Sequence, residues 1–173
     1  MRSLLLVVAV LAAVALAVVL ALRPGDRAMV ETVFAELDSA LRSRDAAGVV
    51  ELAGPDYDFA GHWGETLRGL SGGVEVLGPD RSAVQRVQVR ALLQGALARP
   101  GGEPPRLHVE VLEVDGAEGR VRARVLLRLA SGWRGLTLVP SRGGETVGFE
   151  FTRHGWLFPA LRVARHDPVV VRR

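Results

Sequence analysis

The stretch DYDFAGHW, from Asp56 to Trp63, gathers the side chains of this chain that are best suited to chemistry. Two carboxylates, a phenol, an imidazole and an indole lie within it, whereas most of the surrounding sequence is aliphatic. A carboxyl group in an apolar pocket has a raised pKa, which suits it to accept a proton near neutral pH. On a catalytic interpretation, Asp58 or Asp56 is therefore the proton acceptor. Tyr57 or His62 then donates a hydrogen bond.

A structural interpretation explains the same residues without catalysis. Asp56 follows Pro55, and aspartate at such a position commonly stabilises a turn. Asp58 and His62 would then border a solvated loop, because residues 60–73 include five glycines. The sequence favours this structural interpretation and leaves the catalytic one as the alternative.

We expect neither a metal site nor a cofactor. The chain has no cysteine, and no pair of histidines has the His-x-His or His-x-x-x-His spacing of a metal site. Two of the dispersed histidines could still meet in space, but we expect His166 in a carboxyl-terminal tail beside Asp167. Nucleophile-elbow, phosphate-loop and dinucleotide-binding motifs are all missing from the sequence.

The charge distribution argues against a nucleic-acid partner. All 22 basic residues are arginines, but 19 acidic residues are mixed among them, so the net charge is only +3. Arg120, Arg122, Arg124 and Arg128 line the outward face of one predicted strand. They would either meet lipid phosphates or form a solvated face with acidic partners, and the charge balance favours the solvated face.

Residues 1–24 are predicted to be a membrane anchor. The run from Leu4 to Leu22 contains no polar residue, and its 19 residues would form a helix about 28 Å long, close to the hydrocarbon thickness of a bilayer. A cleaved signal peptide is less favoured, because the small-x-small motif Ala15-Leu16-Ala17 lies inside the apolar run. The short head before the run favours a single-pass cell-membrane protein whose main domain is extracytoplasmic.

Helices are predicted next along the chain. Val30, Val33, Phe34, Leu37 and Leu41 have the spacing of one helical stripe, in a helix capped by Asp26. Asp45 is expected to cap a second, short helix over residues 46–53. A third helix is predicted from Asp80 or Ser82 to about Leu97.

Strands fill the rest of the domain. Residues 106–114 and 120–129 read as a hairpin, followed by strand regions near 135–139, 145–151 and 156–164, with a short strand also predicted at 74–77. Pairing Val111 with Ala123 gathers the apolar side chains on one face and sets Glu110 opposite Arg124. The apolar face is predicted to bury seven residues against the helices: Leu107, Val109, Val111, Ala123, Val125, Leu127 and Leu129.

Helices followed by antiparallel strands predict an α+β fold, with about three helices packed on a curved sheet behind the transmembrane helix. Residues 26–166 resemble the nuclear transport factor 2-like superfamily, which includes SnoaL-like and ketosteroid isomerase-like proteins. The resemblance is carried by VETVFAELDSALRSRDAAGVVELAGPDYDF, by VEVLEVDGAEGRVRARVLL and by FEFTRHGWLFPALRV. It implies a cone-shaped domain over residues 25–168 with a pocket at its open end, followed by a basic tail over 169–173.

The favoured function is a membrane-anchored, non-enzymatic domain that binds a small apolar ligand or a membrane protein partner. Asp56, Trp63 and Trp156 are the expected pocket-lining residues. The alternative is a cofactor-independent isomerase, dehydratase or hydrolase that uses Asp58 with Tyr57 or His62. The resemblance also implies dimers through the outer sheet face, but arginines on that face predict a monomer or a weak dimer.

Overall fold

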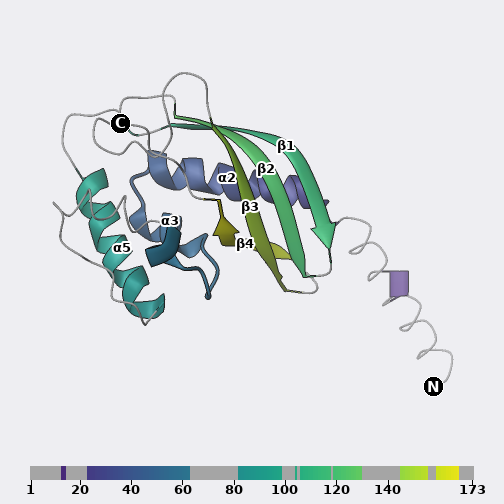
Figure 1. Cartoon of the computed structure of the whole chain (residues 1–173), viewed down its shortest axis with the longest axis horizontal. Helices are drawn as coiled ribbons and strands as arrows, with labels where there is room; N and C mark the ends of the chain where they lie inside the picture. Colours follow the sequence, from purple (N-terminus) through teal and green to yellow (C-terminus); the bar gives the residue numbers. More distant parts are fainter. Residues whose placement is uncertain are drawn as a thin grey trace.

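The computed structural model describes residues 13–14, 23–62, 82–98, 104, 106–117, 119–129, 145–155 and 159–167. Helices come first along these residues and strands follow, as predicted (Figure 1). The helices are α2 (Asp26–Arg42), α3 (Ala46–Glu51) and α5 (Ser82–Leu97), and residues 59–62 form one further helical turn. The strands are β1 (Leu107–Ala117), β2 (Arg120–Leu129), β3 (Glu145–His154) and β4 (Ala160–His166).

The four strands form a single antiparallel sheet in the order β1-β2-β3-β4. Each strand pairs with the next one along the chain, and the sheet bends so that α2 lies across one face (Figure 1). Gly119 and Gly155 follow β1 and β3 with φ of 77° and 81°, a backbone conformation that glycine adopts without steric cost. The α+β fold class is therefore confirmed.

The main core lies between α2 and the sheet. Val30, Val121, Val125 and Phe151 are fully buried there. The Phe34 ring meets the Phe151 ring edge-on at a centroid distance of 6.2 Å. Each such side chain stabilises the fold by roughly 1.5–3 kcal/mol relative to an exposed one. The predicted apolar sheet face therefore does close over the first helix.

A second core cluster joins α3 and α5 to the chain that follows α3. Its buried members include Val50, Tyr57, Phe59, Val89 and Leu93. Leu37 of α2 and Val163 of β4 pack against both clusters, so they connect the two cores.

The predicted hairpin register is wrong by two residues. Val111 pairs with Val125 rather than with Ala123. A shift of two residues keeps every side chain on its expected face, so the buried face is unchanged. Leu112 is an extra residue in β1, and this bulge turns Glu113 outward, where it pairs with Arg124 in place of Glu110.

The two predicted caps have different outcomes. The Asp45 carboxylate accepts hydrogen bonds from the backbone N–H groups of Ala47 and Gly48, both at 3.0 Å, so this cap is confirmed. Asp26 is instead the first residue of α2, after Gly25 as the N-cap. Its carboxylate accepts a hydrogen bond from Arg153 of β3 at 2.5 Å, which fastens the start of α2 to the sheet.

The chain after α3 pairs with the outer edge of β4. The N–H of Gly54 donates to the carbonyl of Val163 at 2.7 Å, and the N–H of Val163 donates to the carbonyl of Leu52 at 2.9 Å. These bonds form a short parallel bridge that was not predicted. They place the DYDF segment against the end of the sheet.

Arg86 of α5 fastens the same segment from the other side. Its guanidinium donates to the carbonyls of Val50, Ala53 and Gly54, and it lies 5.5 Å from the centre of the Phe59 ring. One side chain thus satisfies carbonyls that the end of α3 leaves without helical partners.

Several predicted elements lie outside the described residues. They are the strands near 74–77 and 135–139, the tail at 169–173, and all of the apolar run 4–22 except residues 13–14. Among the residues that the structure does describe, no helix is long and apolar enough to cross a membrane.

Replacing Arg86 with methionine tests the guanidinium clamp. We expect Arg86→Met to lower the free energy of unfolding by about 2 kcal/mol, because half-buried carbonyls lose a charged donor. Urea unfolding followed by circular dichroism measures this change. The control Arg90→Met alters an exposed arginine one turn further along α5 and should stay within about 0.5 kcal/mol of the unmodified protein. Equal effects of the two substitutions would contradict the clamp.

Candidate functional site

Four aromatic rings from three parts of the chain gather beside the end of β4. The centroids of His62 and His166 are 4.6 Å apart. The Tyr57 ring lies 5.2 Å from His62 and 5.9 Å from His166, and Phe149 lies 5.6 Å from His166. We call Tyr57, His62, Phe149 and His166 the histidine cluster.

Local backbone structure positions Tyr57 and His62. The N–H of Tyr57 donates to the carbonyl of Gly54 at 3.1 Å, which closes the turn at Pro55-Asp56. The Asp58 carboxylate then accepts from the N–H of Gly61 at 2.9 Å and caps the helical turn 59–62. That turn carries His62 back toward the sheet.

The structure separates the site residues predicted from DYDFAGHW. Tyr57 is buried and His62 is half-buried, and both belong to the histidine cluster. Asp56 and Asp58 are exposed to solvent. The exposure of Asp58 is the arrangement that we expect of a binding domain rather than of an enzyme with Asp58 as its base. Trp63 and Trp156 lie outside the described residues.

His166 is the functional candidate that the sequence placed in the wrong position. It is the last residue of β4, not part of a tail, and only 7% of its surface is exposed. Phe151 pairs with Val163 and Glu150 with Arg165, so Ala164 is an extra residue between them. This bulge reverses the alternation and turns His166 inward. A regular strand with Leu161 and Val163 inside would have turned it outward.

Hydrogen bonding indicates which ring nitrogen of His166 carries the proton. Its Nδ1 lies 2.7 Å from the carbonyl oxygen of Asp167, and a carbonyl can only accept, so we assign the proton to Nδ1 and the lone pair to Nε2. Burial lowers the pKa of His166, the hydrogen bond to the Asp167 carbonyl partly offsets this effect, and the neighbouring His62 lowers the pKa again. Burial also lowers the pKa of His62, partly offset by the Asp58 carboxylate. Both rings are therefore mainly neutral at pH 7.

An apolar cavity of about 80 Å³ lies next to the histidine cluster, between the two cores. Its lining comes from α2, α3, α5, the sheet and the DYDF segment. Tyr57 and His166 are the two lining residues with polar side-chain atoms; the others are apolar: Val33, Phe34, Leu37, Val49, Val50, Leu52, Ala53, Phe59, Val89, Leu93, Phe149 and Val163. We call this space the inner cavity.

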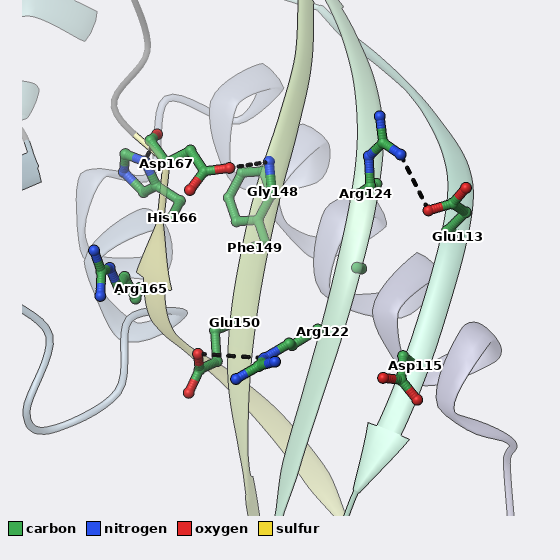
Figure 2. A pocket seen from close by; sticks show the side chains of 11 residues that line it. Glu113, Asp115, Arg122, Arg124, Gly148, Phe149, Glu150, Arg165, His166 and Asp167 are labelled. Atoms are coloured by element: carbon green, nitrogen blue, oxygen red, sulfur yellow. Dashed lines mark hydrogen bonds and ion pairs between the residues drawn. The ribbon is translucent and has the colours of Figure 1, made fainter.

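A charged hollow of about 420 Å³ lies on the opposite face of the sheet (Figure 2). We call it the outer groove. Arg124 pairs with Glu113 at 3.2 Å and Arg122 with Glu150 at 3.7 Å, which confirms a solvated face with acidic partners. The full lining is Glu113, Asp115, Arg122, Ala123, Arg124, Gly148, Phe149, Glu150, Arg165, His166 and Asp167.

Within the part of the chain that the structure describes, no three histidine or acidic side chains are grouped so that they could hold a metal ion. His166 and Tyr57 border the inner cavity. Both can exchange hydrogen bonds with a bound molecule.

Comparison with solved structures finds likenesses of fold. The chain is similar to a solved structure from Thiobacillus denitrificans, described as a calcium/calmodulin-dependent protein kinase type II association domain. The TM-score is 0.45 and the sequence identity 14%, over 87% of this chain and 98% of that chain. No protein-family model and no curated protein matches the chain. A likeness at this level does not assign the chain to a family.

Acidification should destabilise the protein through the histidine cluster. The folded pKa values of His62 and His166 lie below the ordinary 6.5, so the unfolded chain binds more protons as the pH falls below about 6.5. The contribution of the two histidines to the free energy of unfolding is fully present above about pH 6.5. It is lost as the pH falls from there toward their folded-state pKa values. The charges of Asp58 and Asp167 raise the pKa of His62, whereas the charge of Arg165 lowers it. Asp167 also raises the pKa of His166.

We expect the thermal unfolding midpoint to be lower at pH 5.5 than at pH 7.5. In the double variant His62→Gln with His166→Gln, the difference between the two midpoints should be smaller than in the unmodified protein. This comparison does not depend on how stable the variant is at pH 7.5. His108→Gln, at an exposed histidine on β1, is the control and should keep the full decrease. The same pH dependence in all three proteins would exclude the cluster as its source.

Proposed function

We propose that this domain binds a small, mainly apolar ligand in the inner cavity without catalysing a reaction. The supporting observation is the lining of the cavity, which consists of apolar side chains from both cores together with Tyr57 and His166. Ligand pockets typically combine an apolar wall with a few polar groups that orient the ligand. The ring centroids of Tyr57 and His166 are 5.9 Å apart.

The size of the inner cavity limits the ligand. At about 80 Å³ it is smaller than an engineered cavity of about 150 Å³ that holds benzene. A short alkyl chain fits such a space better than a fused ring system.

An enzyme is the second candidate, and the fixed tautomer of His166 favours it. A buried, neutral imidazole whose Nδ1–H is held by a carbonyl is oriented as a base at Nε2. An isomerase, dehydratase or hydrolase of this design would use His166 and Tyr57, with His62 next to them. Asp58 would contribute only through its charge, because it is exposed and caps a helical turn.

Filling the inner cavity tests ligand binding. We expect 1-butanol to raise the thermal unfolding midpoint of the full chain by mass action, and Ala53→Leu to remove most of this shift, because Ala53 lines the cavity. Ala160→Leu makes the same change at an exposed residue of β4 and should keep the shift. If Ala53→Leu does not fold, Val49→Phe is a second way to fill the space. Equal shifts in all the proteins would contradict binding in the cavity.

We also propose that residues 1–24 anchor the domain in the cell membrane with the domain extracytoplasmic. The support is the apolar run from Leu4 to Leu22. On this proposal residues 4–22 contact the lipid bilayer, and a membrane protein is a second partner of the chain. A charged outer sheet face favours a monomer or a weak dimer.

Two arginines in the apolar run test the anchor. We expect the full chain to stay in the membrane pellet after alkaline carbonate washing. Leu11→Arg with Val14→Arg should release most of it, since each central arginine costs about 2.5–3.5 kcal/mol on insertion scales. Leu112→Arg with Val87→Arg adds the same charge at exposed positions of the domain and should leave the chain in the pellet. Release of the unmodified chain would exclude the anchor.

A further inference from the structure

His166 puts a titratable ring into the wall of the inner cavity. Only 7% of its surface is exposed, and it lines the cavity together with Tyr57 and apolar side chains. Histidine is the side chain that ordinarily changes its charge between pH 5 and pH 8. Among the described residues that line the cavity, His166 is therefore the one that gains a charge on mild acidification.

A charged His166 and an apolar ligand do not tolerate each other. An alkyl chain placed against the ring cannot solvate a charge, and burial without solvation disfavours the charged form. The described lining residues of α2, α3 and α5 are apolar, so these helices supply no opposite charge on the cavity side. A neutral ring makes no such demand. The protonation state of His166 should therefore decide whether an apolar molecule stays in the cavity.

The chain after α3 adds to this conflict. The ring centroid of His62 lies 4.6 Å from that of His166, so the two rings repel each other when both carry a proton. Tyr57 lies beside both rings and is a neutral phenol. The Asp58 carboxylate acts on His62, whose pKa it raises. Asp58 does not line the cavity and cannot compensate a charge there.

The charges of the sheet lie on the other side of His166. Asp167 raises the pKa of His166, but its carboxylate accepts a hydrogen bond from the N–H of Gly148 and lines the outer groove, not the inner cavity (Figure 2). Arg165 also lines the outer groove, and its charge opposes protonation of the neighbouring His62. The other charged residues of the outer groove are Glu113, Asp115, Arg122, Arg124 and Glu150.

We infer that the inner cavity holds an uncharged ligand at neutral pH and releases it on acidification, when a proton on His166 puts a positive charge into the cavity wall. This inference rests on the proposed binding function and adds its regulation. Coupling between two binding equilibria is reciprocal. A ligand that is released by protonation must therefore also make His166 harder to protonate.

The affinity for 1-butanol at two pH values tests the release. This probe has no group that ionises between pH 5 and pH 8, so any pH dependence comes from the protein. We expect its Kd for the full chain in phospholipid nanodiscs to be about fivefold higher at pH 5.5 than at pH 7.5, as is typical of coupling between two sites. NMR titration measures Kd, with empty nanodiscs as the blank. The acidic titration uses the pH nearest 5.5 at which the circular dichroism spectrum is unchanged.

Three substitutions assign the effect to one ring. His166→Gln keeps a polar side chain that cannot be charged, and it should bind 1-butanol equally well at both pH values. His62→Gln should move the loss of binding to higher pH, because a charged His62 no longer lowers the pKa of His166. His108→Gln changes an exposed histidine of β1 and should keep the pH dependence of the unmodified protein.

The reciprocal effect can be measured without any substitution in the cavity. The four histidines of the chain are labelled with ¹³C at Cε1, and their NMR signals are followed through a pH titration. Saturating 1-butanol should lower the pKa of His166 and leave the titration curve of His108 where it is. This measurement decides the question if His166→Gln does not fold.

The outcomes separate the regulation from the binding itself. Equal Kd values at both pH values, an unchanged pH dependence in His166→Gln, or a His166 titration that ignores 1-butanol would overturn the regulation and leave apolar binding in place. Absence of 1-butanol binding at pH 7.5 would overturn the proposed function together with this inference.

Discussion

The core of α3 and α5 is joined to the sheet where residues 52–54 pair with the outer edge of β4. Two backbone hydrogen bonds to Val163 fix this bridge, and the Arg86 guanidinium holds the same segment to α5. Backbone polar groups in such a half-buried connection need partners, and both interactions supply them. The DYDF segment follows directly, so the position of Tyr57 depends on this bridge.

The inner cavity follows from the way in which the two cores meet. One core packs α2 on the sheet, and the other packs α3 and α5 on the DYDF segment. Leu37 and Val163 contact both, but they do not fill the space between them. An apolar void loses dispersion contacts along its lining, so a ligand that restores those contacts would stabilise the domain. The cavity therefore results from incomplete packing where the two cores meet.

Two β-bulges decide which side chains can act together. The extra residue Leu112 turns Glu113 outward to pair with Arg124, and the extra residue Ala164 turns His166 inward beside His62. Each bulge moves the rest of its strand to the opposite face. The histidine cluster and the charge pattern of the outer groove therefore depend on single extra residues rather than on residue types alone.

Local patterns in the sequence were enough for the helices α2, α3 and α5, for the four strands of the sheet and for the buried face of the main core. The stripe of Val30, Val33 and Phe34 and the alternation in β2 predicted the main core, because amphipathic periodicity depends only on local geometry. The Asp45 cap was also predictable, since its hydrogen bonds span three residues. Of the candidate site, Tyr57 and His62 could be named from DYDFAGHW. His166 could not, because a bulge and about a hundred residues separate it from His62. Which ring meets which and where the cavity lies are set by long-range packing, and no local pattern in one sequence carries that information.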